Sequence, residues 1–204
     1  MNTALFVTAL LSYFVIIDPI GVSIIFATLT EGKEKSYRQK MRLQSVLLSA
    51  IIILFFGFFG AALLTKLGIS IEAFRITGGL LLFYTAFNMV TKQDAFTLES
   101  NGQSPEDISV YPISFPLLAG PGCLTLTVLL FADAGQRLDN LIALVGAILL
   151  VFFLTFFCFM SAHKLSHFIG KTGNNIVKRL LGVLLASLSI QFIVDGIIGF
   201  QKYL

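Results

Sequence analysis

A proline and a glycine interrupt the first apolar segment of the chain in the stretch FVIIDPIGVS, residues 14–23. A similar interruption, LAGPGCLT, occupies residues 118–125. Proline removes a backbone donor and clashes with the preceding helical turn, and glycine accepts backbone conformations that other residues avoid. Each stretch therefore predicts a helix that is broken within a long apolar segment.

The composition indicates what surrounds those segments. Of the 204 residues, 56% are hydrophobic, only 12% are charged and 21 are Phe, and the mean hydropathy is +0.91. An ordinary soluble domain carries about 25% charged residues, so these charges are too few to cover a soluble fold. The composition therefore excludes a soluble enzyme, and no basic run is long enough to indicate nucleic-acid binding.

Six apolar segments are each long enough to cross a bilayer as a helix, since a span needs about 20 residues. They are 3–29, 43–65, 69–90, 111–131, 140–162 and 176–199. Continuously apolar runs do not fit barrel strands, which are short and alternating. We therefore predict an all-α polytopic membrane protein with six transmembrane helices. Before the sixth, Gly173-Asn174-Asn175 predicts a turn and an N-cap.

Lysine and arginine fall unequally on the two sides of these spans. Ten lie on the side of the loops after spans one, three and five, namely Lys33, Lys35, Arg38, Lys40, Arg42, Lys92, Lys164, Lys171, Lys178 and Arg179. The other four are Lys66, Arg75, Arg137 and Lys202. Because basic residues favour cytoplasmic loops, we predict a multi-pass inner-membrane protein in the lipid bilayer with both termini on the non-cytoplasmic side.

The two halves of the sequence resemble each other. Pro19 aligns with Pro121 at an offset of 102, and Arg75-Ile76-Thr77-Gly78 aligns with Arg179-Leu180-Leu181-Gly182 at an offset of 104. Three spans per half give the halves opposite orientations. We predict two inverted three-helix repeats, 1–90 and 111–204, joined by a polar cytoplasmic linker at 91–110. The alternative is that Gly and Pro recur by chance in apolar sequence.

The two breaks fall near the centres of the first and fourth spans, which makes both helices discontinuous at mid-membrane. Irregular backbone at that depth must face protein or a polar cavity. The half-helices that begin near Gly21 and Gly122 would expose N–H groups and positive dipole ends to a carboxylate. Ser23 and Thr125 could add hydroxyl donors. The candidate substrate-binding residues are Asp18, Pro19, Gly21, Ser23, Gly120, Pro121, Gly122 and Thr125.

Asp18 is the only carboxylate near the predicted membrane centre. An isolated charge at that depth is costly. One interpretation is that Asp18 couples a proton or binds an ammonium. The other is that it caps the half-helix beginning at Pro19, since Asp before a first-turn proline is a favoured helix start. The two roles are compatible, and the matching position in the second half is Gly120.

Polar residues near the ends of the third and sixth spans give a weaker signal. Arg75 is expected to pair with Glu72 on its own helix or with Asp195 across helices, either as a gate or as a structural pair. Gln191 lies one turn before Asp195. Polar residues in spans more often join helices than bind ligands.

No motif indicates a metal or cofactor. His163 and His167 have the spacing of a metal pair, but no carboxylate or cysteine lies in the same short segment. Cys123 and Cys158 both lie in apolar stretches and give no disulfide framework. We therefore predict no metal site and no cofactor.

Together these motifs resemble the MarC-related family of bacterial and archaeal inner-membrane proteins, also described as a neutral amino-acid transporter family. The matching stretches are residues 17–21, 75–80, 115–122, 179–182 and 191–196. They follow the family order along nearly the whole chain. The resemblance implies six spans and, for some members, movement of small neutral amino acids such as glycine and alanine.

We therefore expect a secondary transporter of small neutral amino acids or similar small solutes, working by alternating access. Its partner would be a small zwitterion, and Asp18 would serve the ammonium or a coupling proton. Arg75, Gln191 and Asp195 are the candidate gate or coupling residues. A channel or ion pathway and a non-transporting structural or assembly protein stay open as alternatives, as does the oligomeric state. An intramembrane enzyme is the least favoured class, because Asp18 has no second acid or metal set at its depth.

Overall fold

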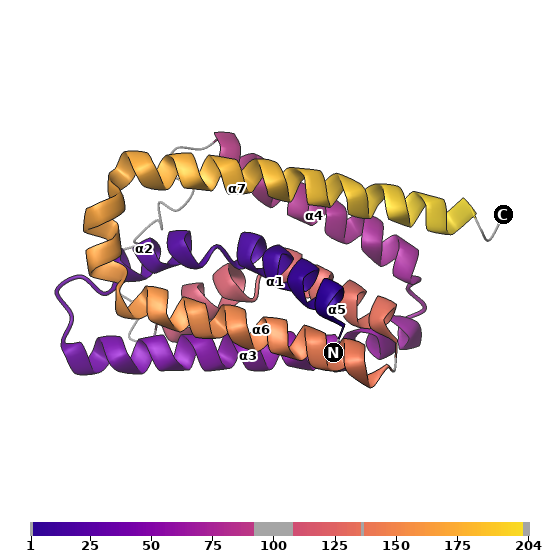
Figure 1. Cartoon of the computed structure of the whole chain (residues 1–204), viewed down its shortest axis with the longest axis horizontal. Helices are drawn as coiled ribbons and strands as arrows, with labels where there is room; N and C mark the ends of the chain where they lie inside the picture. Colours follow the sequence, from indigo (N-terminus) through magenta and orange to yellow (C-terminus); the bar gives the residue numbers. More distant parts are fainter. Residues whose placement is uncertain (1, 92–107, 136, 202–204) are drawn as a thin grey trace.

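The computed structural model describes residues 2–91, 108–135 and 137–201, without the side chains of 163–172, 174 and 178 in the last helix. His163 and His167 are therefore outside the described side chains. The described chain is helical and contains no strand. In chain order its helices are α1 (Thr3–Ile17), α2 (Pro19–Leu29), α3 (Lys35–Lys66), α4 (Ile71–Thr91), η1 (Ser109–Leu118), α5 (Pro121–Ala134), α6 (Leu138–Met160) and α7 (Ala162–Gln201) (Figure 1).

The helices match the apolar segments that the sequence defines. Within the described residues, the stretches long and apolar enough to cross a membrane are Thr3–Leu29, Lys35–Lys66, Ile71–Thr91, Leu138–Met160 and Asn175–Gln201. A sixth is formed if η1 and the helix after it cross as one bent span. The prediction of an all-α protein with several membrane-spanning helices is confirmed.

The length of α3 shows how far the helices reach beyond a bilayer. Its 32 residues give a helix of about 48 Å, whereas a hydrocarbon core is about 30 Å thick. The first turns of α3 carry Lys35, Arg38, Lys40 and Arg42. Those basic turns therefore extend past the apolar part of the helix bundle, as charged side chains in a membrane protein must.

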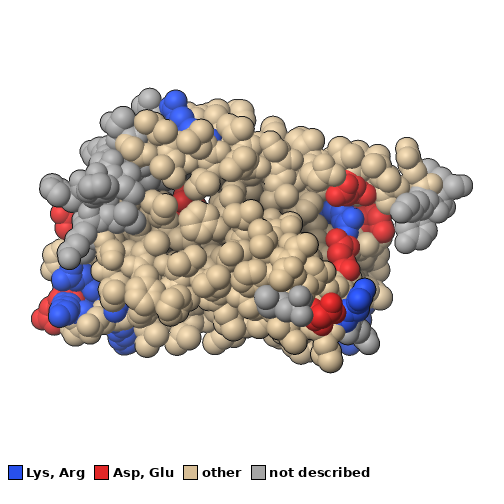
Figure 2. Space-filling model, in the orientation of Figure 1, with Lys and Arg blue, Asp and Glu red and all other residues tan. Residues whose placement is uncertain are grey.

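Charged side chains gather toward the two ends of the molecule, and most of the surface between them is uncharged (Figure 2). The basic end, where α2 leads into α3, carries two acids, Glu31 and Glu34, and a larger number of bases, Lys33, Lys35, Arg38 and Lys40. The opposite, mixed-charge end carries Lys66, Glu72, Arg75, Asp133, Arg137, Asp139 and Asp195. Between the ends, large apolar side chains such as Phe55 and Phe153 point outward. This apolar belt is what a lipid solvent requires.

The buried core has a main part and a smaller second part. The main cluster draws its buried residues mainly from α1, α2, α3, η1, α5 and α6, and it includes Ala162 at the start of α7. The helices α4 and α7 lie side by side along one face (Figure 1), and Leu82, Ala86 and Leu185 form a second cluster between them. The fold is therefore a main group of helices with an α4–α7 pair packed against it.

Glycines bring α4 and α7 into close contact. A Cβ at Gly79 would lie 2.8 Å from the carbonyl oxygen of Ser189, and one at Gly182 would lie 3.2 Å from that of Ala86. Small residues at helix interfaces allow such backbone approach in membranes. Each helix of the pair therefore contributes a glycine that lies against the backbone of the other, and α7 adds a second, Gly196, where a Cβ would lie 3.0 Å from the Glu72 carbonyl oxygen.

The predicted turn at Gly173-Asn174-Asn175 is wrong as an interruption of the helix, although the apolar, membrane-spanning part of α7 does begin at Asn175. Helix α7 runs as one helix of 40 residues through these positions, although its ribbon bends in Figure 1. Gly and Asn disfavour helix by only about 0.5–1 kcal/mol each, and the flanking helical turns continue the hydrogen-bond ladder across them. The predicted linker falls mostly on 92–107, outside the described residues.

Tyr13→Phe is expected to lower the free energy of unfolding by about 1 kcal/mol. The fully buried Tyr13 hydroxyl on α1 donates a hydrogen bond to Thr127 Oγ1 on α5 over 3.0 Å. Removing it deletes a bond between the two halves and leaves the ring in place. Thermal unfolding in detergent measures the loss. Tyr84→Phe is the control, because Tyr84 is 64% exposed on α4; an equal change in both variants would contradict the expectation.

Candidate binding site at two helix breaks

The first break is a single residue, Asp18. It separates α1 from α2 and has a left-handed backbone (φ 47°, ψ 66°), which Asp tolerates better than most residues. Its backbone N–H donates to the Phe14 carbonyl over 3.1 Å, and its Oδ1 accepts from the Gly21 N–H over 3.0 Å. Asp18 therefore ends one helix and caps the next, the capping role that Asp before Pro19 predicts.

The second break lies between η1 and α5 and bends the chain by 55°. Gly120 is extended there (φ −70°, ψ 165°) and α5 begins at Pro121. As the N-cap residue, Gly120 supplies no side-chain cap. The two helix starts therefore differ, because the N-terminus of α2 receives a carboxylate and that of α5 does not. The expectation that both helix starts offer free N–H groups to a ligand carboxylate is wrong for α2.

The segment before the second break is less regular than predicted. Tyr111 and Phe115 have extended backbones, with φ near −130°, inside η1. Each precedes a proline, Pro112 or Pro116, and the residue before proline is forced away from the helical region. The signal for this irregularity is present in the sequence as two X-Pro pairs, which the prediction of a span over 111–131 with a single central break missed.

The structure brings both breaks into one buried core. Ile17 and Val22 flank the first break, and Leu118, Ala119 and Cys123 flank the second. All five are at most 5% exposed and belong to the main buried cluster. Most of the predicted site residues at 18–23 and 120–125 thus lie in the interior, whereas Pro121 is exposed.

The matched hydroxyl groups one turn into each helix are buried and already bonded. Ser23 Oγ donates to the Ile20 carbonyl over 2.7 Å, and Thr125 Oγ1 donates to the Pro121 carbonyl over 2.9 Å. Ser and Thr in helices commonly bond in this way to the preceding turn. In this structure both hydroxyls donate within their own helices, and their role as ligand donors stays a prediction.

Three predicted site positions have no room for a side chain. A Cβ at Gly21 would overlap the Asp18 carboxylate, and one at Gly120 would overlap the carbonyl oxygen of Pro116. A Cβ at Gly122 would overlap the Leu82 side chain. Close approach rather than an unusual φ therefore favours glycine at both breaks, most strictly at Gly120, where the overlapping atom belongs to the backbone.

The ion pair that Arg75 forms is not the predicted one. Arg75 Nη2 lies 2.6 Å from Asp133 Oδ1 and pairs with neither Glu72 nor Asp195. The side chains of Arg75 and Asp133 are 20% and 61% exposed. Helix α5 packs against α4 and brings its last turn within reach, which the sequence did not indicate. Gln191 Nε2 donates instead to Asp195 Oδ1 over 2.8 Å.

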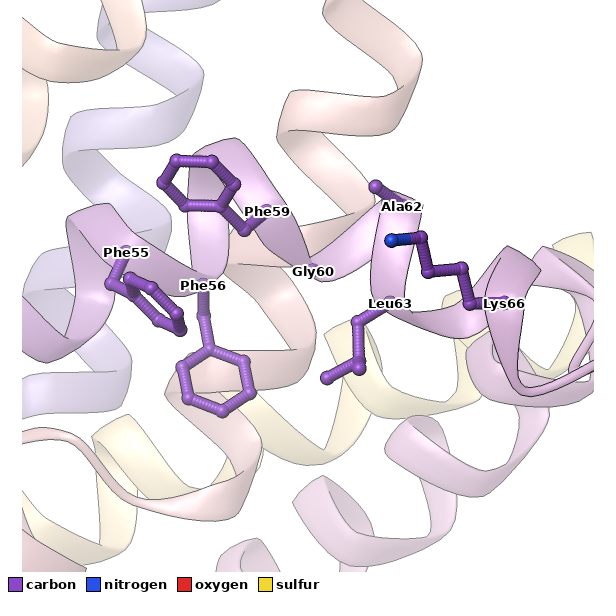
Figure 3. A pocket seen from close by; sticks show the side chains of 7 residues that line it. All are labelled: Phe55, Phe56, Phe59, Gly60, Ala62, Leu63 and Lys66. Carbon is purple, nitrogen blue, oxygen red and sulfur yellow. The ribbon is translucent and has the colours of Figure 1, made fainter.

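An apolar groove of about 230 Å³ lies elsewhere, along the last turns of α3. Figure 3 shows its lining, in which three phenyl rings and Leu63 precede Lys66. The full lining is Phe55, Phe56, Phe59, Gly60, Ala62, Leu63 and Lys66. None of the predicted binding residues borders it, so this groove is separate from the helix breaks.

The apolar belt, the charged ends and the set of long helices define an integral, multi-pass membrane protein. The sequence pattern described as "MarC family integral membrane protein" matches residues 3–201. The chain belongs to the MarC family.

Its relatives cover almost the whole chain. A UPF0056 membrane protein of Methanocaldococcus jannaschii is 34% identical over 98% of this chain and 98% of its own. The UPF0056 membrane protein YvbG of Bacillus subtilis is 32% identical over 98% and 97%, and YhcE of Escherichia coli is 32% identical over 91% and 88%. These names state a membrane protein and no catalytic activity. No solved structure matches the chain.

Proposed function

We propose that this protein is a secondary transporter of small neutral amino acids or similar small zwitterions, and not an enzyme. The observation that carries the proposal is Asp18. Among the described residues it is the only charged side chain in the buried set, at 8% exposure, and it lies at a helix break. Acidic groups inside a membrane protein are costly and typically serve ion or substrate pathways.

The unequal helix starts give the site two poles. Asp18 carries the negative pole, and a carboxylate has about four lone-pair sites, so capping Gly21 and receiving an ammonium or a proton are compatible. The N-terminus of α5 is the positive pole, because Gly120 supplies no side-chain cap and the helix dipole favours an anion there. A zwitterion would place its ammonium at Asp18 and its carboxylate at the start of α5.

The size of the solute follows from the glycines of the second break. Gly120 and Gly122 leave no side chain beside Pro121, and Leu82 lies against Gly122. This close packing around the second break disfavours a solute with a large side chain. Solutes as small as glycine and alanine, which the family resemblance implies, are compatible with this packing.

Two inverted repeats would provide alternating access, and the helix packing supports them. The middle helix of each half packs on the broken helix of the other half: α6 packs on α1 and α2, and α3 packs on η1 and α5. The last helix of each half does the same: α7 packs on α2, and α4 packs on α5. Gly79 of α4 lies against Ser189 and Ile193 of α7, and Gly182 of α7 lies against Ala86 and Val90 of α4. Each residue of one contact is 103 positions from its counterpart in the other, a spacing between the offsets of 102 and 104 that align the two halves of the sequence. A two-fold relation between the halves would produce this pattern.

The orientation of the protein in the membrane is part of the proposal. Helix α1 begins and helix α7 ends at the mixed-charge end (Figure 1). Basic residues concentrate at the opposite end, which favours a cytoplasmic location for that end. Both termini would then lie on the non-cytoplasmic side of the inner membrane.

Uptake of labelled glycine and alanine into proteoliposomes tests the proposal. We expect saturable uptake above that of empty vesicles, and an imposed pH gradient should change its rate if Asp18 carries a coupling proton. Leucine and phenylalanine are the size controls and should be taken up at least about tenfold more slowly. Uptake equal to that of empty vesicles for every solute would contradict the assignment.

A further inference from the structure

We infer that the Arg75–Asp133 ion pair is one of two alternating gates, and that Glu31 and Arg179 form the second gate in the opposite state. The inference rests on the proposed alternating-access transporter. The first gate is closed in this structure, since the charged atoms of Arg75 and Asp133 are 2.6 Å apart. It joins α4, from the first half of the chain, to α5, from the second half.

The second pair follows from the repeat. The alignment of Pro19 with Pro121 continues without a gap to Glu31 and Asp133, at the same offset of 102. The alignment of the Arg-x-x-Gly motifs, at an offset of 104, places Arg75 on Arg179. The packing offset of 103 places it on the neighbouring Lys178, so the second half has a base at either position. An acid at the end of the broken span and a base in the third span of the repeat therefore occur in both halves, at opposite ends of the molecule.

In this structure the second pair is not formed. Glu31 and Arg179 are both exposed, and no ion pair joins them within the described chain. The local helices differ accordingly: α5 continues through Asp133 to Ala134, whereas α2 stops at Leu29, short of Glu31. The repeat thus contains two equivalent charge pairs, of which one is closed and one is open.

This asymmetry identifies the state of the molecule. The mixed-charge end is held shut by Arg75 and Asp133, and the basic end is released. In the opposite state α2 would gain its last turn, Glu31 would reach Arg179, and Arg75 would release Asp133. Two pairs that close in alternation would prevent the site from opening to both sides at once, which is what a rocking repeat needs.

Accessibility of a single cysteine at Ser23 tests the gates without any solute. Ser23→Cys is built with Cys123→Ser and Cys158→Ser, and a membrane-impermeant thiol reagent is added at the mixed-charge side. In that background, Asp133→Asn should raise the labelling rate about fivefold, which corresponds to an ion pair worth about 1 kcal/mol. Asp139→Asn is the matched control, because its partner Arg137 is 3.8 Å away at the same end and both are widely exposed.

The second gate is tested by reversal. Glu31→Gln should destabilise the opposite state, so Glu31→Gln combined with Asp133→Asn should return labelling to near the starting rate. Glu31 is changed rather than Arg179 because another basic residue, Lys178, precedes Arg179. A merely structural ion pair would show no such reversal. Equal labelling after unfolding in detergent verifies that each variant presents the same total thiol.

The outcomes separate the gates from the transport proposal. Absent amino-acid uptake with the expected labelling pattern would reject the substrate and leave the gates in place. Normal uptake with Asp133→Asn labelled no faster than Asp139→Asn would overturn the gates and leave the transporter in place. A double variant labelled as fast as Asp133→Asn alone would also overturn the alternation of the two pairs.

Discussion

Asp18→Asn is expected to fold like the parent protein and to transport about ten- to a hundredfold more slowly. A hydrogen bond to a charged group contributes about 1.5–3 kcal/mol, and each 1.4 kcal/mol is a factor of about ten in rate or affinity. The asparagine keeps an Oδ1 acceptor for the Gly21 N–H, 3.0 Å away in the parent. It is also a good N-cap and tolerates the left-handed backbone. Uptake and thermal unfolding, measured on one preparation, separate the two effects.

Two further variants make the Asp18 result interpretable. Asp18→Ala loses the charge, the cap and the tolerance of a φ of 47°, so it should also unfold more easily, by about 1–3 kcal/mol. Asp139→Asn removes an exposed acid at the mixed-charge end and should change neither property. Undiminished uptake by Asp18→Asn would remove Asp18 from substrate binding and coupling, and would leave it only the capping role.

Gly120→Ala is expected to cost at least about 3 kcal/mol of stability, at the upper end of the range for overpacking. The new Cβ would overlap the Pro116 carbonyl oxygen, which is a backbone atom and cannot rotate away. The bend between η1 and α5 would have to open, so we expect a low yield of monodisperse protein and a lower unfolding temperature.

Gly146→Ala is the matched control for Gly120→Ala. Gly146 lies inside α6, and a Cβ there would meet Phe6 at an ordinary 3.5 Å. Alanine is the better helix former by about 1 kcal/mol, so this variant should be as stable as the parent or more so. A Gly120→Ala protein as stable as Gly146→Ala would show that the break can accept a side chain.

The membrane-spanning segments can be predicted from the sequence because the thickness of the hydrocarbon core sets their length. A helix must bury its backbone polar groups across about 30 Å of hydrocarbon, and long apolar runs meet that need wherever they occur. The positions of the interruptions follow from the chain as well. Pro19 and Pro121 cannot donate an N–H and each takes the first position of a helix in the structure.

The partner of Arg75 does not follow from the chain alone. Glu72, a partner that the sequence suggests, is only three residues from Arg75. Gly78 has no side chain, however, so the Thr125 side chain packs directly against it and α5 lies close to α4. From that contact Asp133 is eight residues, about 12 Å, further along α5, and Arg75 is three residues, about 4.5 Å, back along α4. The long Arg75 side chain spans the remaining distance. Only the packing of two distant helices reveals this pair.

The different capping of α2 and α5 is a second feature that comparison of the two halves of the sequence does not predict. The repeat aligns Asp18 with Gly120 and suggests two similar anion sites. The structure instead directs the Asp18 carboxylate to the start of its own helix, so the two sites have opposite character. That difference is what gives the proposed site one pole for an ammonium and one for a carboxylate.

Solute counterflow in proteoliposomes tests the central claim, that the protein is an alternating-access carrier for small zwitterions. Vesicles are loaded with unlabelled alanine and diluted into a trace of labelled alanine. The account predicts a transient accumulation of label above its equilibrium level, strongly reduced in Asp18→Asn, because each turnover exchanges one internal solute for one external solute. Label that only equilibrates, at a rate independent of internal alanine, would indicate a channel and contradict the account, as would label no higher than in empty vesicles.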